Sequence, residues 1–184
     1  MVVPEDPTID QYVLKPIVEQ LFADLGKTPR VQVLSNPRLH GVSQALDASI
    51  LADIVETNRM IDVFLVLVDR DGDDKKRPLQ AKERTRQHPD RLFVCLAIEE
   101  IEVWMLALHR DVLGVPWRDV RAERDPKERF AQPFLTAQAP KLSAGGGRAW
   151  AMRELGSKWK GVLDVCPELA ELKQTLADWL SRRS

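Results

Sequence analysis

The sequence feature that most constrains the fold is the continuous apolar run Val63-Phe-Leu-Val-Leu-Val68. Strands with one solvated face alternate apolar and polar residues, whereas strands covered on both faces of a parallel sheet are apolar throughout. The run therefore predicts a central strand of a parallel sheet in an α/β protein. It spans only six residues, against about 20 for a helix that crosses a bilayer, so we expect no membrane segment.

Shorter apolar runs and amphipathic segments alternate on either side of this strand. Between residues 9 and 25 the apolar side chains recur at the spacing of one helix face, and Gly26 follows them. The same reasoning predicts strands at 2–3, 31–34, 63–68 and 92–96, and helices at 9–25, 44–59, 77–88 and 98–113. This order is typical of a Rossmann-like, open and mostly parallel sheet flanked by helices.

The character of the chain changes after Gly114. Prolines recur between residues 116 and 140, which predicts loops and short helices, whereas apolar spacing predicts a helix at 168–180. We therefore predict an α/β core at 1–113 and a loop-rich, helical C-terminal appendage at 114–184 that packs on it. The total of 184 residues suits one domain, since domains have about 100–200 residues.

Charge and cysteine content narrow the classes of function. With 27 Lys and Arg against 28 Asp and Glu the net charge is −1, which excludes binding of nucleic acid by bulk positive charge but leaves room for a local basic face. Cys95 and Cys166 are too few for a disulfide framework or a thiolate zinc site. The first residues have neither the basic nor the apolar region of a signal peptide, so we expect a cytoplasmic protein.

An acidic turn follows the central strand, with Asp69, Asp71, Asp73 and Asp74 within six residues. Ligands of open α/β sheets bind beyond the carboxyl ends of the strands, and residues two apart on an extended strand point the same way. We therefore predict that Asp69 and Asp71 hold Mg²⁺ or Mn²⁺; a solvated turn is the alternative. A calcium-binding EF-hand loop is rejected, because a strand precedes the turn and Gln80 stands where that loop requires Glu.

Two further strand ends carry carboxylates toward the same edge of the sheet. Glu100 and Glu102 follow the last predicted strand, and Glu5 and Asp10 follow the first. The alternatives are stabilisation of a helix dipole for the Glu pair and helix capping for Asp10. Because parallel strands end at one edge, we predict that these carboxylates converge with Asp69 around two divalent ions. Two ions about 4 Å apart form the arrangement that cleaves phosphodiesters.

These residues together resemble the Toprim pattern, in which one Glu is followed by an Asp-x-Asp motif after an apolar strand. Glu5 matches the Glu, and Asp69-Arg-Asp71 matches the motif. The segment Glu100-Ile-Glu102-Val-Trp104, with Asp125-Pro-Lys127 downstream, is similar to a narrower family. That family contains small stand-alone Toprim proteins of the OLD (overcoming lysogenization defect) nuclease type. Several of them are encoded beside an AAA or ABC-type ATPase as anti-phage systems.

The resemblance implies a Toprim-like core and a role for each matched residue. Glu5 would be the general base or a ligand of the first metal ion, and Lys127 would balance phosphate or transition-state charge. The metal ligands that it implies are Glu5, Asp69, Asp71, Glu100 and Glu102.

The chain departs from this pattern in its first motif. Asp6 stands where the family has Gly, and Ile9 stands where the family usually has an acid. Asp10 would replace that acid after a shift of one residue. These departures favour the alternative that the metal site is degenerate.

Basic residues near the acidic turn are candidates for contact with DNA. Lys75, Lys76 and Arg77 follow the turn directly, and Arg124 lies further along the chain; a solvated helix face is the alternative. The glycines at 145–147 precede Arg148 without the Gly-Lys-Ser/Thr of a P-loop, so we predict a flexible hinge there.

Three hypotheses of function follow. The first is a nuclease that cleaves DNA with Mg²⁺ or Mn²⁺, in a prokaryotic anti-phage defence system. The second is a non-catalytic regulatory or interaction subunit of an AAA or ABC-type ATPase, with a degenerate Toprim site. The third is a phosphohydrolase of small molecules, and the oligomeric state stays open in all three.

Overall fold

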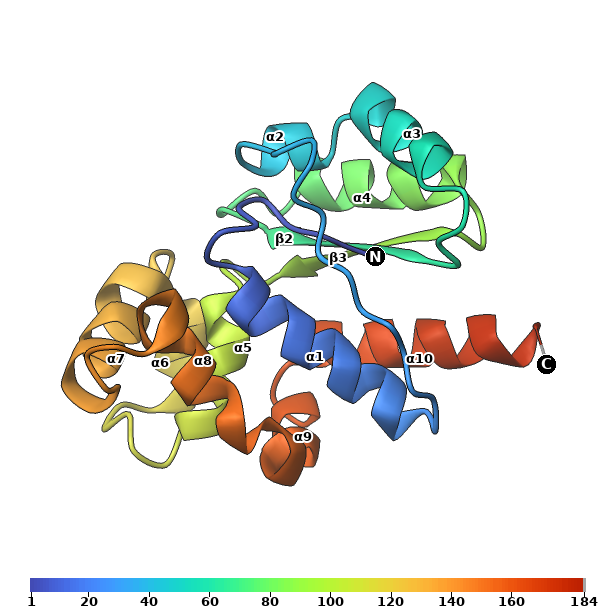
Figure 1. Ribbon diagram of the computed structural model, residues 1–184. Helices are drawn as coiled ribbons and strands as arrows, with labels where there is room; N and C mark the ends of the chain where they lie inside the picture. Colours follow the sequence, from blue (N-terminus) through green and yellow to red (C-terminus); the bar gives the residue numbers. More distant parts are fainter. Residues whose placement is uncertain (184) are drawn as a thin grey trace.

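The computed structural model describes residues 1–183 and shows an α/β protein built on a three-stranded parallel sheet (Figure 1). The strands are β1 (Val2–Val3), β2 (Phe64–Asp69) and β3 (Leu92–Ala97), in the spatial order β1-β2-β3. β2 pairs in parallel with both neighbours, so that Leu65 lies opposite Val2 on one side and Phe93 on the other. The predicted α/β class and the parallel pairing of an open sheet are confirmed, and the Toprim-like character of the core stays a prediction.

The prediction of a full strand at 31–34 is wrong. This segment forms one isolated parallel bridge, between Val33 and Val2. The Val2 N–H donates to the Gln32 carbonyl at 2.8 Å, and the Leu34 N–H donates to the Val2 carbonyl at 2.8 Å. Since β1 has only two residues, its outer edge offers too few backbone groups for a longer ladder.

This bridge shows that the winding of the chain reverses at β1. The segment 31–34 lies on the edge of β1 that faces away from β2. From there the chain crosses back to β2 and then continues to β3. The topological switch point therefore lies between β1 and β2. In open α/β sheets the ligand crevice lies at such a point, outside the carboxyl ends of the strands.

Both faces of β2 are buried, as its apolar sequence predicts. Phe64, Val66 and Val68 enter one hydrophobic cluster, and Leu65 and Leu67 enter a second cluster on the other face. All five side chains are at most 1% exposed. Alternate residues of the strand thus anchor two separate layers of helices.

Three helices cover the first face, in the upper part of Figure 1. They are α2 (Val42–Ala45), α3 (Ala48–Thr57) and α4 (Lys76–Gln87). α4 confirms the helix predicted at 77–88, but the single helix predicted at 44–59 is wrong. Asp47 interrupts it, because its Oδ1 accepts the N–H groups of Ser49 at 2.9 Å and Ile50 at 3.0 Å, and such a cap starts a new helix.

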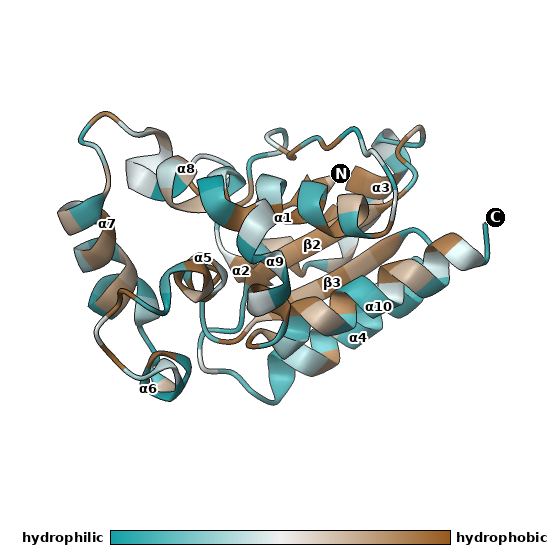
Figure 2. Ribbon diagram, turned by 90° about the horizontal axis from the view of Figure 1, so that it is seen from below, coloured by the Kyte–Doolittle hydropathy of each residue, from teal (hydrophilic) through white to brown (hydrophobic). Residues whose placement is uncertain are grey.

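Two long amphipathic helices, α1 (Gln11–Asp24) and α10 (Pro167–Ser181), cover the second face. They confirm the helices predicted near both ends of the chain. Leu14 and Leu21 of α1 and Leu169 and Leu176 of α10 are fully buried. Figure 2 shows the strands as hydrophobic ribbons between helices of mixed hydropathy.

α5 (Glu102–Leu106) is shorter than the helix predicted at 98–113. Glu99, just before it, has a left-handed backbone with φ of 55°, which a right-handed helix excludes. After α5 the chain continues as a short 3-10 turn, Ala107–His109. The segment 98–101 is therefore a turn that contains Glu99 and Glu100, whereas Glu102 begins α5.

The helices after residue 113 pack directly on this core. α6 (Trp117–Ala122), a π-helical turn (Lys127–Ala131), α7 (Gln132–Gln138) and α8 (Arg148–Ala151) gather with α5 beyond the carboxyl ends of the strands, and α9 (Leu155–Leu163) leads back to α10. Val120 and Trp159 belong to the same hydrophobic cluster as Leu65 of the sheet. Within residues 1–183 there is no helix with the length and apolar character to cross a membrane.

Candidate functional site

Glu5 and Asp69 meet at the topological switch point of the sheet. Glu5 follows β1 and accepts the backbone N–H of Asp69, the last residue of β2, at 2.6 Å through Oε1. Asp69 in turn accepts the N–H of Ile101, beyond the end of β3, at 2.8 Å through Oδ1. The structure therefore brings all three strand ends together, as the sequence predicts.

Charge is concentrated and poorly solvated at this point. Burial, together with repulsion from Glu5 and Glu102, raises the pKa of Asp69 to about 9. Burial also raises the pKa of Glu5 to about 7, with Asp71 and Asp10 adding repulsion. Carboxylates in such a position favour protonation or a bound cation.

Asp10 belongs to the same cluster, although it also begins α1. Its Oδ2 accepts the N–H of Asp6 at 2.9 Å, and its side chain makes no capping bond to the helix. Burial raises its pKa to about 6, and Glu102 and Asp6 add repulsion. The capping alternative therefore does not account for Asp10, and its role as a metal ligand stays a prediction.

The prediction that Asp71 points the same way as Asp69 is wrong. β2 ends at Asp69, and Asp71 lies in a left-handed turn with φ of 50°, so the alternation of an extended strand does not continue to it. Its Oδ2 instead pairs with Nη2 of Arg77 at 3.1 Å, and its side chain is 46% exposed. Asp71 lies at the rim of the cluster and contributes repulsion to Glu5.

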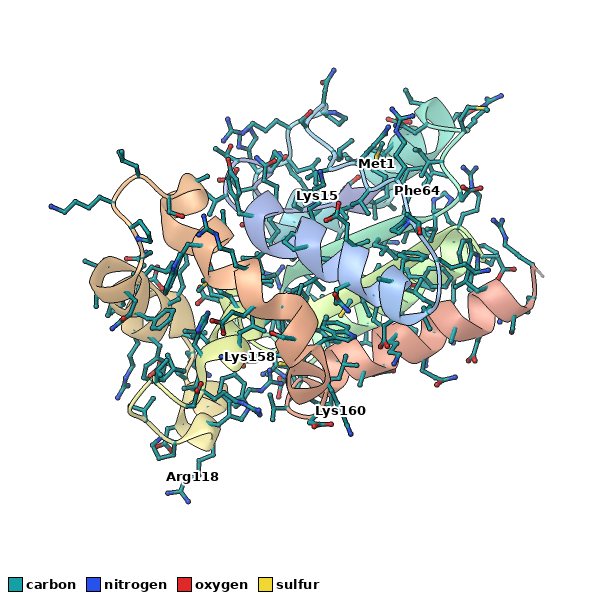
Figure 3. All side chains as sticks on the ribbon, turned by 60° about the horizontal axis from the view of Figure 1, so that its bottom comes forward. Met1, Lys15, Phe64, Arg118, Lys158 and Lys160 are labelled. Carbon is teal, nitrogen blue, oxygen red and sulfur yellow. The ribbon has the colours of Figure 1, made fainter. Side chains whose placement is uncertain are left out.

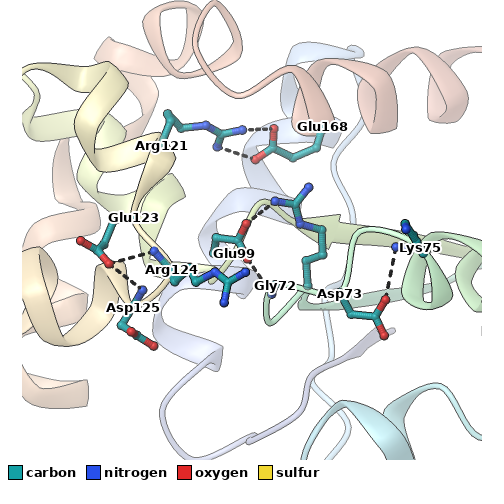
Figure 4. A network of polar contacts seen from close by, with 10 residues as sticks. Gly72, Asp73, Lys75, Glu99, Arg121, Glu123, Arg124, Asp125 and Glu168 are labelled. Atoms are coloured by element: carbon teal, nitrogen blue, oxygen red, sulfur yellow. Dashed lines mark hydrogen bonds and ion pairs between the residues drawn. The ribbon is translucent and has the colours of Figure 1, made fainter.

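Glu99 holds the acidic turn in place, a role that the sequence analysis missed. Its carboxylate forms an ion pair with Arg70 and accepts the Gly72 N–H at 2.6 Å (Figure 4). Its carbonyl accepts the Arg70 N–H at 2.9 Å. A left-handed backbone at a residue other than Gly costs roughly 1–3 kcal/mol. These contacts keep both Glu99 and Asp71 in that conformation.

Glu100 and Lys127 extend the cluster on the side of the π-helical turn. Oε2 of Glu100 accepts the backbone N–H of Lys127 at 2.7 Å. Burial raises the pKa of Glu100 to about 7, with repulsion from Glu102. Burial lowers the pKa of Lys127, but the carboxylates of Glu102 and Glu100 raise it. The net result is a pKa above the ordinary value of lysine. Lys127, the predicted positive charge, is thus close to the predicted carboxylate ligands.

The carboxylate of Glu102, a predicted metal ligand, is paired with a buried arginine. Its Oε1 accepts hydrogen bonds from Nη2 of Arg148 at 2.5 Å and from Nε of Arg148 at 3.2 Å. The two side chains are 2% and 8% exposed. The sequence analysis missed Arg148 and predicted a flexible hinge before it. The only local signal was a glycine run that ends on an arginine.

The basic candidates lie around this edge without sharing one surface. Lys75, Lys76 and Arg124 are exposed, and Figure 4 shows Lys75 and Arg124 on separate segments near Glu99. Arg38, which the sequence analysis did not single out, donates to Thr8 Oγ1 at 3.1 Å. Arg118 extends away from the body of the protein (Figure 3) and is 86% exposed. Contact of Lys75, Lys76, Arg77 and Arg124 with DNA stays a prediction.

The donor atoms at the switch point are of the type that binds divalent cations. Glu5, Asp10 and Asp69 offer hard carboxylate oxygens, the ligands that Mg²⁺ and Mn²⁺ prefer, and a cation would relieve their mutual repulsion. Among residues 1–183, however, no group of three or more His, Cys, Asp or Glu stands arranged around a common metal position. The fit therefore rests on the chemistry of the donors and on their excess negative charge.

A cavity of about 600 Å³ lies elsewhere, at the amino ends of the strands. Phe22, Val31, Ile61 and Trp179 are among its lining residues. Lys27, Arg30, Asp62 and Arg183 line it as well, but none of the clustered carboxylates does. The candidate site is therefore the acidic edge rather than this cavity.

Comparison of the chain with protein-family models, with curated proteins and with solved structures finds no significant match. The function is therefore argued from the acidic edge of the sheet itself.

Proposed function

We propose that this protein hydrolyses phosphodiester bonds of DNA with Mg²⁺ or Mn²⁺, as a small Toprim protein of the OLD nuclease type. The observation that carries the proposal is the contact between Glu5 and Asp69 at the switch point, with Asp10 beside it. These residues are the Glu and the first Asp of the Toprim pattern, and they meet where open α/β sheets bind their ligands. An anti-phage role and a cytoplasmic location belong to the same proposal.

The residues of the chain divide the chemistry between them. Glu5, Asp69 and Asp10 would hold the ion, which supplies Lewis acidity toward a phosphate oxygen and makes a bound water more acidic. Glu5 is also a candidate general base, through the carboxylate oxygen that does not accept the Asp69 N–H. Lys127 supplies a positive charge that stabilises the charge developing on the phosphate.

A polyanionic substrate suits the surroundings of the site better than a small phosphate does. Lys75 and Lys76 are exposed after the acidic turn, Arg124 is exposed on the C-terminal side, and Arg38 lies beside Asp6. Cations on separate sides of the carboxylates can contact phosphates on either side of a scissile bond. The net charge of −1 makes this local placement necessary, because bulk attraction is absent.

The test is nicking and cleavage of a supercoiled plasmid with Mn²⁺ or Mg²⁺. We expect Asp69→Asn to abolish cleavage and Asp71→Asn to weaken it, because only Asp69 lies inside the cluster. Asp74→Asn is the matched control, an exposed carboxylate of the same turn. Equal loss in the Asp69 and Asp74 variants, or no cleavage by wild type with Mn²⁺, would reject the nuclease. Hydrolysis of a generic phosphate ester without DNA cleavage would favour the small-molecule phosphohydrolase.

A second candidate function is that of a non-catalytic subunit of an AAA or ABC-type ATPase. Two observations favour it: Asp71 pairs with Arg77, and Glu102 pairs with Arg148, so two predicted ligands are already neutralised. The departures at Asp6 and Ile9 add to them. This candidate predicts that Mn²⁺ leaves the melting temperature unchanged while the ATPase binds the chain.

A further inference from the structure

The pair Glu102–Arg148 is the most buried ion pair of the described residues. Glu102 begins α5 and Arg148 begins α8, 46 positions apart in sequence. Nε and Nη2 of the guanidinium both donate to one carboxylate oxygen, at 3.2 and 2.5 Å. Nη1 donates to the Gly145 carbonyl at 3.1 Å. The guanidinium is thus held from two directions.

The same pair adjoins the candidate site. Glu102 directly follows Ile101, whose N–H donates to Asp69 Oδ1 at 2.8 Å. The Glu102 carboxylate also adds repulsion to Asp69 and Asp10. Lys127 is within the reach of Glu102 and of Arg148 as well. The positive charge of Arg148 is therefore at the acidic edge and not in a remote part of the core.

The glycine run before Arg148 is shaped to place it there. Gly145, Gly146 and Gly147 all have left-handed backbones. A Cβ on Gly145 would come within 2.4 Å of the Tyr12 ring, and a Cβ on Gly147 within 2.7 Å of Ala139. Because side chains are excluded at these positions, the run is a tightly packed turn that fixes the direction of Arg148. The predicted hinge is corrected accordingly.

A buried ion pair is weak evidence for stability, because desolvation of two charges offsets most of their attraction. The position of this pair at the edge of an acidic cluster therefore needs an explanation other than stability. Oε1 of Glu102, which accepts both guanidinium bonds, cannot also ligate an ion without giving up those bonds. The guanidinium also neutralises the charge that this carboxylate would offer to a second ion. The resemblance assigns Glu102 to a second metal ion, and the structure puts a guanidinium at that carboxylate instead.

We propose that the Arg148 guanidinium takes the place of a second divalent ion, so that the chain binds a single ion at Glu5, Asp10 and Asp69. This inference rests on the proposed function and deepens it. Arg148 would then be a built-in cation, with one positive charge in place of two. It would be present at every concentration of metal.

The test is the binding of Mn²⁺ to the full chain, measured as stoichiometry by calorimetry and as spin coupling by electron paramagnetic resonance. Wild type is expected to bind one ion per chain, with the spectrum of an isolated ion. Arg148→Met frees the Glu102 carboxylate and is expected to bind a second ion, with the spectrum of a coupled pair. Glu102→Gln/Arg148→Met removes both charges and is expected to bind one ion again, with cleavage at least tenfold slower than that of wild type.

Two coupled ions in wild type would overturn the inference and leave the proposed nuclease intact, whereas no bound ion would overturn both. One ion in folded Arg148→Met would show that the pair is only structural. If circular dichroism shows that Arg148→Met does not fold, the double variant decides. Cleavage by the folded double variant at the wild-type rate would then overturn the role of Arg148.

Discussion

Replacing Asp69 with Asn is expected to stabilise the metal-free protein at neutral and alkaline pH. Burial and the repulsion from Glu5 and Glu102 raise the pKa of Asp69 from 3.8 to about 9. A carboxyl group whose pKa is raised by folding contributes its full stability below the unfolded pKa and loses it as the pH rises through the folded pKa. The contribution of Asp69 to the free energy of unfolding of wild type therefore falls from about pH 4 to pH 9, whereas Asn is neutral throughout.

The magnitude follows from the pH interval over which only the folded state keeps the proton. Each pH unit above the ordinary pKa of 3.8 costs about 1.4 kcal/mol. At pH 7 Asp69→Asn should therefore gain about 4 kcal/mol. A change of 1 kcal/mol moves Tm by about 2–4 °C in a chain of this length, so Tm should rise by roughly 10 °C. The Asn Oδ1 can keep the hydrogen bond from the Ile101 N–H.

The assay is thermal unfolding followed by circular dichroism in EDTA, between about pH 4 and pH 8.5. The difference between Asp69→Asn and wild type should vanish at the acid end and grow with pH. Asp74→Asn serves as the control, because this exposed carboxylate should change the stability by less than about 0.5 kcal/mol. Melting of Asp69→Asn at or below wild type at pH 8 would refute the reasoning.

Three further predictions concern the metal, the ion pair and the glycine turn. Mn²⁺ at about 100 times its Kd should stabilise wild type by about 2.7 kcal/mol and leave Asp69→Asn unchanged in the same melts; equal shifts would place the ion elsewhere. Glu102→Ala leaves its guanidinium partner buried and unpaired, so urea unfolding should show a loss of about 3–5 kcal/mol, and a loss below about 1 kcal/mol would contradict the burial of the pair. Gly147→Ala combines a left-handed backbone with a Cβ contact of 2.7 Å and should cost about 3 kcal/mol. Gly26→Ala has a left-handed backbone but open space, so it should cost about 1 kcal/mol, and equal losses would contradict the packing argument.

The buried carboxylates of the acidic edge lower the stability of the metal-free fold. Asp69, Glu5 and Asp10 have raised pKa values through burial, so folding without a cation is opposed by their desolvation. Apolar or amide side chains would make a more stable turn. Positions that break the rules of packing in this way are expected at functional sites, and this agrees with the choice of the acidic edge as the candidate site.

Local patterns in the sequence were sufficient to predict several elements of this protein. The unbroken apolar run of β2 predicted a strand with two buried faces, because each alternate side chain must enter a hydrophobic layer. The apolar stripes of α1 and α10 predicted those helices for the same reason. The meeting of Glu5 and Asp69 also follows from the order of strands along the chain, since parallel strands end at one edge.

Contacts between distant segments of the chain set the remaining features, and these became visible in the folded protein. β2 ends at Asp69 because the contacts of Glu99 with Arg70 and Gly72 turn the chain there. As a result Asp71 pairs with Arg77 at the rim of the cluster. The partner of Glu102 lies 46 residues away and is selected by a glycine turn packed on Tyr12. Such pairings are stabilised by burial and by charge in the assembled fold, and no local spacing in the sequence records them.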